Sequence, residues 1–308
     1  MYNAGDDAPR AGSTRSRALA FVRILLAGVL IALVYSRVDL GATLGVLRTA
    51  PVSALAIPAG ILVVNSLLHA LRLGLLLRAV PVGALVVVAF LGNFFGMALP
   101  TGGGEAAKIL LLRRHVGASN AAAALVATRM MEMLPWGVLM AYGAWFVLPS
   151  HLPEYVPFTT VISAALCAVP VVGAALTIGG ARVSGRLPRW VRTRLPDLGT
   201  VRVRDALLCQ LLAFPFSFLN VLAVGVILWA LGAQVPVADL YGVVPAVDFV
   251  VALPITVSGL GLREGMFVDA FGRWGVPQEV AVAAALLRWA AELGRAAIGG
   301  VLFAVGRR

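Results

Sequence analysis

The chain has 308 residues, of which 60% are hydrophobic and only 13% are charged. This composition excludes an ordinary water-soluble domain and indicates a membrane protein. The formal net charge of +11 is also typical of nucleic-acid-binding proteins, but no basic and aromatic platform accompanies it. Arginines in membrane-flanking loops explain the charge better, so we expect no nucleic-acid partner.

Apolar runs long enough to cross a bilayer recur along the chain, which predicts an all-α polytopic membrane protein. The runs are continuous rather than alternating, which argues against a membrane β-barrel. Residues 1–16 are polar and small, and we expect them to form a disordered cytoplasmic tail. The predicted spans are residues 17–36, 51–79, 118–148, 157–180, 205–232 and 278–306.

Two further apolar regions, residues 83–115 and 238–273, are interrupted near their middles by glycine-rich sequence. Each half is shorter than the roughly 20 residues that a membrane-crossing helix needs. Irregular backbone is tolerated within a membrane only where it is buried in protein or lines a cavity. We therefore predict two re-entrant helical hairpins. Full crossing by both arms of each hairpin is the alternative, and loop charge does not separate the two because both give the same topology elsewhere.

The distribution of arginine predicts the orientation. The loop 181–204 carries seven arginines, whereas the loop 149–156 carries neither lysine nor arginine. The first is therefore expected in the cytoplasm and the second outside, with both termini cytoplasmic. Arg37 and Arg48 are exceptions, because this topology puts them in an outside loop.

An internal repeat relates the two broken regions. Ala-Leu-Pro precedes both, at residues 98–100 and 252–254, and Arg129 and Arg288 each follow a glutamate by 24 residues when Glu105 is aligned with Glu264. Matched landmarks over about forty residues indicate a true repeat. Each half, 17–148 or 157–306, holds three spans, so the halves enter the membrane in opposite senses. The prediction is an inverted 3+3 repeat, a plan common among secondary transporters.

Intramembrane charges are the main indication of function. A charge facing lipid at a helix centre costs roughly 2.5–3.5 kcal/mol, so these side chains are expected to face the bundle, water or one another. Glycines at the breaks permit close backbone approach, and helix starts favour anions. The expected substrate-binding residues are Arg72, Gly103, Gly104, Glu105, Lys108, Arg129, Gly261, Arg263, Glu264 and Arg288, and the expected structural or coupling charges are Glu132, Asp248, Glu292 and Arg295.

Structural alternatives remain open for several of these residues. Glu105 and Glu264 could cap the helix starts and pair with the neighbouring bases. The pairs Arg129/Glu132 and Arg288/Glu292 could be ion pairs that hold a span to its hairpin. Arg72, in a polar stripe with Asn65 and His69, could line a cavity, or it could reach the cytoplasmic headgroups together with Arg78.

Catalytic and metal-binding motifs are missing from the sequence. The GGGEAAK stretch lacks the ending of a Walker motif, and the three histidines and two cysteines are scattered. No acid–base or nucleophile set can be assembled. We therefore expect no enzyme activity, no metal and no cofactor.

The segments GNFFGMALPTGGGEAAKILLLRRHVG (92–117), ATRMMEML (127–134) and LPITVSGLGLREG (253–265) resemble the flippase-like membrane region of lysylphosphatidylglycerol synthases. That region also stands alone in many prokaryotic integral membrane proteins, and the resemblance covers about residues 17–306. The resemblance is carried by Asn93, Pro100, Gly104 and Glu105 in the first region and by Gly261, Arg263 and Glu264 in the second. It adds Asn93 to the expected substrate-binding residues. Lys108 stands where the family usually has arginine, and Glu132 where aspartate is usual. No aminoacyl-transferase domain is recognised here, so lipid synthesis is not implied.

The resemblance implies movement of a lipid headgroup between the leaflets of a prokaryotic cytoplasmic membrane. The substrate would be an anionic phospholipid, its aminoacylated form or a polyprenyl-phosphate-linked lipid. Lys108, Arg129, Arg263 and Arg288 would bind phosphate, while the glutamates position these bases, engage a cationic headgroup or carry a coupling proton. The alternatives are an ion-coupled carrier of small solutes and a non-transporting subunit of a glycosyltransferase or lipid synthase. Besides lipids, a second copy of the chain or a lipid-modifying enzyme are the expected partners.

Overall fold

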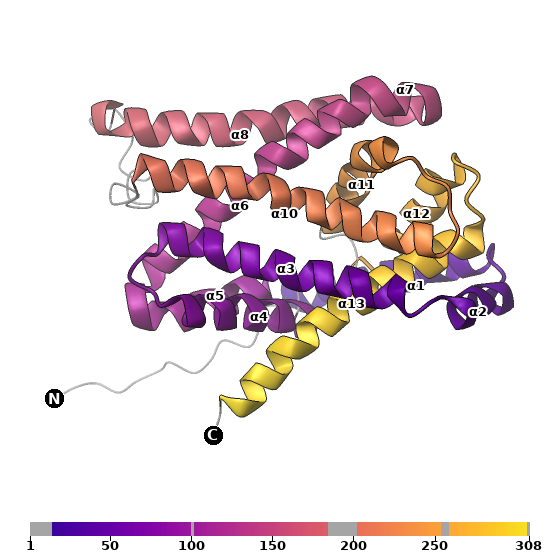
Figure 1. The fold of residues 1–308 in the computed structure, drawn as a ribbon, viewed down its shortest axis with the longest axis horizontal. Coiled ribbons are helices and arrows are strands. Elements are labelled where there is room, and N and C mark those ends of the chain that lie inside the picture. Colours follow the sequence, from indigo (N-terminus) through magenta and orange to yellow (C-terminus); the bar gives the residue numbers. More distant parts are fainter. Residues whose placement is uncertain (1–13, 100–101, 184–201, 254–258, 307–308) are drawn as a thin grey trace.

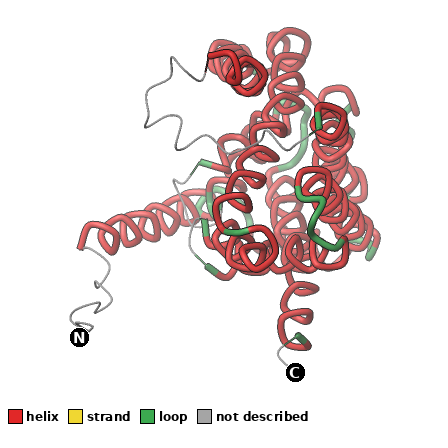
Figure 2. The backbone as a smooth tube through the Cα atoms, turned by 90° about the vertical axis from the view of Figure 1, so that its left-hand side faces the viewer, coloured by secondary structure: helices red, strands yellow, loops and turns green. Residues whose placement is uncertain are grey.

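The computed structural model describes residues 14–99, 102–183, 202–253 and 259–306, and all regular structure in these ranges is helical (Figure 2). The prediction of an all-α protein is therefore confirmed. The predicted N-terminal tail up to residue 13, most of the arginine-rich loop (184–201) and parts of both predicted hairpin turns (100–101 and 254–258) lie outside the described residues.

The helices follow one another in the order labelled in Figure 1. They are α1 (Thr14–Tyr35), α2 (Leu40–Thr49), α3 (Ser53–Leu76), α4 (Val82–Ala98), α5 (Gly103–Val116), α6 (Ala118–Tyr142), the π-helical turn η1 (Gly143–Val147), α7 (Leu148–His151), the 3-10 turn η2 (Pro153–Tyr155), α8 (Val156–Val183), α10 (Val203–Ala230), α11 (Val237–Ala252), α12 (Leu262–Gly272) and α13 (Gln278–Val305).

Among the described residues, four helical segments are long and apolar enough to cross a membrane: Ser53–Leu76, Ala118–His151, Pro153–Val171 and Val203–Ala230. A fifth results if Leu25–Tyr35 and Leu40–Thr49, which meet at 86°, form one broken span. Helix α13 fills the predicted span 278–306, but every 18-residue stretch of it contains Arg288, Glu292 and Arg295. It is therefore too charged to count as a span by composition.

Two boundaries differ from the sequence prediction. The predicted outer loop 149–156 begins as helix, because α6 continues through η1 into α7 as far as His151. The predicted loop with Arg37 and Arg48 contains α2, whose first turn is capped by Asp39. Its carboxylate accepts hydrogen bonds from the N–H groups of Gly41 at 2.7 Å and Ala42 at 3.1 Å. A local capping side chain thus starts a helix in a segment where hydropathy did not predict one.

Helices α3 and α10 form the centre of the molecule and pack antiparallel along much of their length (Figure 1). Near one end of the pair Arg78, two residues after the end of α3, contacts Asp205 of α10. Six residues earlier in the chain, the Arg72 Nε of α3 donates to the Cys209 carbonyl at 3.2 Å. Helices α4 and α13 pack against α3, while α6 and α11 pack against α10.

Glycine allows the closest helix contacts. A Cβ atom on Gly104 of α5 would lie 2.5 Å from the Gly92 carbonyl of α4, and one on Gly299 of α13 would lie 2.2 Å from the Phe90 carbonyl. Neither space admits a methyl group, since atoms at these distances overlap. The two arms of the first predicted hairpin, and the contact between α4 and α13, therefore depend on glycine.

A side-chain hydrogen bond compensates for a proline inside α6. Pro135 lies inside this helix and has no N–H to donate to the Met131 carbonyl one turn earlier. The Gln210 Nε2 of α10 donates to that carbonyl instead, at 3.0 Å. A side chain from the central pair thus satisfies the backbone group that the proline leaves free, and ties α6 to α10.

Candidate functional site

Buried charges from α3, α5 and α6 converge in one network, which we call the first cluster: Arg72, Glu105, Lys108, Arg129 and Glu132. Arg72 is fully buried. Its guanidinium donates to the Glu132 carboxylate at 2.7 Å and to the Thr128 carbonyl at 2.9 Å, and it lies 5.4 Å from the Phe216 ring. The alternative in which Arg72 reaches cytoplasmic headgroups is therefore wrong, because its guanidinium is buried inside the bundle and paired with Glu132.

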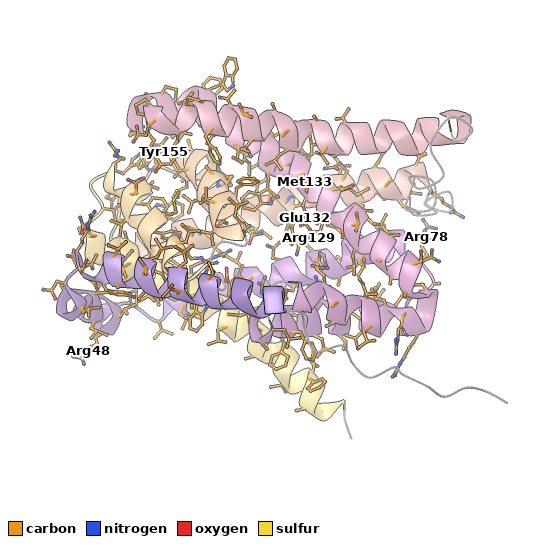
Figure 3. All side chains as sticks on the ribbon, turned by 180° about the vertical axis from the view of Figure 1, so that it is seen from behind. Arg48, Arg78, Arg129, Glu132, Met133 and Tyr155 are labelled. Carbon is orange, nitrogen blue, oxygen red and sulfur yellow. The ribbon has the colours of Figure 1, made fainter. Side chains whose placement is uncertain are left out.

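Arg129 links the two carboxylates of the first cluster. It donates to Glu105 at 2.9 Å and to Glu132 at 3.0 Å, while Lys108 donates to Glu105 at 3.1 Å. The Arg129 side chain is 57% exposed, although Glu132 is only 7% exposed. Figure 3 shows both residues near the middle of the molecule, away from its ends. One side of this network is thus sealed in protein, and the other is accessible.

A second cluster gathers on α11, α12 and α13 and consists of Asp248, Arg263, Arg288, Glu292 and Arg295. The Glu292 carboxylate accepts a hydrogen bond from Arg263 at 3.2 Å and pairs with the Arg288 Nε at the same distance. Arg288 also donates to the Asn220 Oδ1 of α10 at 3.1 Å. Asp248 interacts electrostatically with Arg288 and Arg263, and Arg295 with Glu292.

The second cluster contains buried donors without hydrogen-bond partners among the described residues. They are the Nε of Arg263, the Nε and Nη1 of Arg288 and the Nε of Arg295. The Arg288 Nε lies close to Glu292, but not in hydrogen-bond geometry. Buried donors are normally satisfied, and leaving them unpaired is costly. Guanidinium groups with free N–H donors suit an anion with several oxygens, such as phosphate.

The ion pairs that the sequence left open are formed. Arg129 pairs with Glu132 on its own helix and with Glu105 on α5, and Glu292 pairs with both Arg288 and Arg263 of α12. In each case a long helix is joined to the short helix that precedes it in the chain. This confirms the expected ion pairs, and the charges of Arg129, Arg263 and Arg288 are already partly neutralised.

Glu105 and Glu264, aligned in the repeat, lie in different surroundings. Both fall in the first turn of a short helix, as expected. Glu105 takes part in the first cluster, but the buried Glu264 carboxylate accepts the Gly261 N–H at 2.7 Å and forms no ion pair among the described residues. The capping alternative therefore holds for Glu264, while Glu105 is a pairing residue.

The remaining predicted residues lie close to the clusters and make packing contacts. A Cβ on Gly261, which has φ of +78°, would meet the Ile31 nitrogen of α1 at 2.9 Å. One on Gly103 would meet the side chain of Leu99. Asn93 of α4 donates to the Ser66 hydroxyl of α3 at 3.0 Å. These contacts position the short helices, and whether the same residues touch substrate stays a prediction.

The structure adds two residues that the sequence analysis left out of the site. His69 lies 3.5 Å from the Lys108 Nζ and 3.7 Å from Glu132, within the first cluster. Asn220 holds Arg288 in the second. The sequence feature that could have identified both residues is a polar side chain inside a long apolar helix. Such a side chain costs free energy in a membrane unless it has a polar partner. Within the described ranges, no group of His, Cys, Asp and Glu side chains has the arrangement of a metal site.

The family assignment agrees with this geometry. A family model for the lysylphosphatidylglycerol synthase TM region matches residues 20–299, a range that includes every residue of both clusters. The chain belongs to this family. No curated protein and no solved structure matches it. Membership supports a membrane domain with a lipid-related role.

Proposed function

We propose that this member of the lysylphosphatidylglycerol synthase membrane-region family is a lipid flippase. It moves the headgroup of an anionic phospholipid, an aminoacylated phospholipid or a polyprenyl-phosphate-linked lipid across a prokaryotic cytoplasmic membrane. The observation that carries the proposal is the set of buried, unpaired guanidinium donors in the second cluster. A phosphate oxygen would satisfy them, since arginine forks match phosphate geometry.

The pattern of helix contacts supports an inverted repeat. Helix α13 packs on α4 and α3, and α6 packs on α11 and α10. Suppose that α3, α4 and α6 correspond to α10, α11 and α13. The contact of α13 with α4 is then equivalent to that of α6 with α11, and the contact of α13 with α3 to that of α6 with α10, as a two-fold relation requires. Residues 17–148 and 157–306 would then be the two halves. We propose further that α4–α5 and α11–α12 are re-entrant hairpins and, from the arginine distribution, that both termini are cytoplasmic. Broken helices meeting between halves are a common site plan in transporters.

Access from the side favours a lipid over a water-soluble solute. A flippase must let the acyl chains stay in the bilayer while the headgroup enters the protein. Arg129 and Glu105 are 57% and 35% exposed, so the first cluster is not enclosed on all sides. Figure 2 shows the helix that leads from the N-terminus, α1, projecting away from the rest of the bundle. We propose that the headgroup enters from the side on which Arg129 and Glu105 are exposed.

The decisive experiment measures lipid movement in liposomes that contain only this purified protein. Labelled phospholipids and polyprenyl-phosphate lipids are compared, with and without a proton gradient. Arg263→Ala should abolish movement, because it removes a binding donor and one of the two arginines that pair with Glu292. The matched control is Arg273→Ala, at the far end of the same helix, where Arg273 pairs with the exposed Glu154. This control should transport normally.

Either of two results would contradict the proposal. No movement of any lipid by the folded wild-type protein would favour a solute carrier or a partner-dependent subunit. Equal transport by Arg263→Ala and the wild type would show that the second cluster is not the binding site.

A further inference from the structure

The amide of Asn65 is fully buried at the centre of the bundle and has no partner in the part of the chain that the structure describes. Neither its Nδ2 nor its Oδ1 makes a hydrogen bond there, and the residue is 0% exposed. Such a group costs free energy in the resting structure, because it has lost its contacts with water. Leucine would fill a similar space without that cost. The arrangement therefore indicates a role that needs the amide.

Contacts between α3 and α10 locate Asn65 along the central pair. Leu62 of α3 packs in one cluster with Ala223 of α10. The two helices are antiparallel, so residue numbers rise along α3 where they fall along α10. Three residues beyond the contact lie Asn65 on α3 and Asn220 on α10. Each step covers about 4.5 Å of helix, so the two asparagines lie at the same level.

This level lies between the two charge clusters. On one side, His69 of the first cluster is one helical turn from Asn65 and on the same face of α3, since residues four apart are neighbours. At the level of Asn65 itself, Asn220 accepts the hydrogen bond of Arg288 from the second cluster. Asn65 is therefore a neutral polar group between two sites that each contain several cations.

We propose that Asn65 contacts the phosphate of the lipid headgroup while the headgroup passes between the first and second clusters. This inference rests on the proposed flippase function. The Nδ2 group donates a hydrogen bond to a phosphate oxygen, and the Oδ1 accepts one from a hydroxyl or ammonium group of the same headgroup. The amide is satisfied only with the headgroup midway, so it stabilises the intermediate of transport more than either end state.

A neutral amide suits a transit site better than a third cluster of bases. A permeating group must be bound strongly enough to enter and weakly enough to leave. A lysine or arginine here would hold the phosphate as firmly as the flanking clusters do. An aspartate would repel it.

The test compares three variants by the movement of phosphatidylglycerol with a fluorophore on one acyl chain, quenched from outside the vesicle. Asn65→Leu removes the amide at similar volume, and Asn65→Ser keeps a hydroxyl donor. Leu62→Met is the matched control, fully buried on the same helix and substituted at nearly constant volume. Thermal stability and equilibrium binding of phosphatidylglycerol are measured in parallel.

Asn65→Leu should transport about tenfold to a hundredfold more slowly, the loss expected for a hydrogen bond to a charged group in the rate-limiting state. Its lipid binding should stay within about twofold of wild type, because both clusters are intact, and its stability should be equal or higher. Asn65→Ser should recover part of the rate, and Leu62→Met all of it.

Wild-type transport by Asn65→Leu would overturn the inference while leaving the flippase function intact. The inference also fails if Leu62→Met slows transport as much as Asn65→Leu, because packing would then be the cause. If Asn65→Leu does not fold, a rate for Asn65→Ser below one hundredth of wild type in a stable protein would refute the donor role. A wild-type protein that moves no lipid would instead refute the proposed function itself.

Discussion

Replacing Glu132 by glutamine is expected to destabilise the protein by about 3 kcal/mol, at the lower end of the cost of breaking a buried ion pair. The Glu132 carboxylate accepts Arg72 at 2.7 Å and Arg129 at 3.0 Å. After the substitution, the fully buried Arg72 has only neutral acceptors among the described residues, which include the carbonyls of Cys209 and Thr128. Arg129 retains Glu105. One buried cation thus loses its counter-charge, and the cost arises mainly from leaving that charge uncompensated.

The assay is unfolding by sodium dodecyl sulfate in mixed micelles, followed by circular dichroism. Glu154→Gln is the control, because Glu154 and its partner Arg273 are both about half exposed, and such surface pairs contribute less than about 1 kcal/mol. The double variant Arg72→Met/Glu132→Leu should be less destabilised than Glu132→Gln, since apolar side chains replace both charges. Equal losses of stability for Glu132→Gln and Glu154→Gln would refute the reasoning. A double variant that is destabilised more than Glu132→Gln would also refute it.

Two further predictions concern packing and backbone hydrogen bonds. Gly104→Ala should cost about 1–3 kcal/mol through overpacking of α5 against α4, whereas Gly294→Ala, at an exposed helical position with nothing within 4 Å of the new methyl group, should stabilise by up to about 1 kcal/mol. Thermal unfolding measures both, and similar shifts would contradict the close contact. Gln210→Leu should cost about 1–3 kcal/mol by leaving the Met131 carbonyl unpaired. In a Pro135→Ala background, the restored N–H should remove most of that loss, and an unchanged loss would disprove the compensation.

The helical elements were largely predictable from hydropathy. The broken regions 83–115 and 238–273 are occupied by pairs of short helices, with breaks where the glycine-rich sequence lies. Glycine and proline interrupt helices through local backbone effects, which neighbouring residues in the chain already determine. Helix α2 was missed because its cap at Asp39 is a local signal within a loop that hydropathy passes over.

The candidate site was predictable in composition but not in pairing. Each charge of the two clusters was identified from its cost in an apolar segment. The different roles of Glu105 and Glu264 were not, because the repeat aligns them at equivalent positions. Whether a carboxylate turns to a backbone N–H or to an arginine depends on side chains brought close by other helices, here Arg129 for Glu105.

The sequence alone determined that this is a helical membrane protein with two interrupted apolar regions and charges beside them, since burial cost and helix breaking act over short stretches of chain. Only the tertiary structure decided that Arg72 is sealed against Glu132, that Gln210 serves the carbonyl released by Pro135, and that the Asn65 amide has no partner among the described residues. The first two contacts join residues that lie 60 or more positions apart, and distances of this kind are set by how α3, α6 and α10 pack rather than by any local pattern.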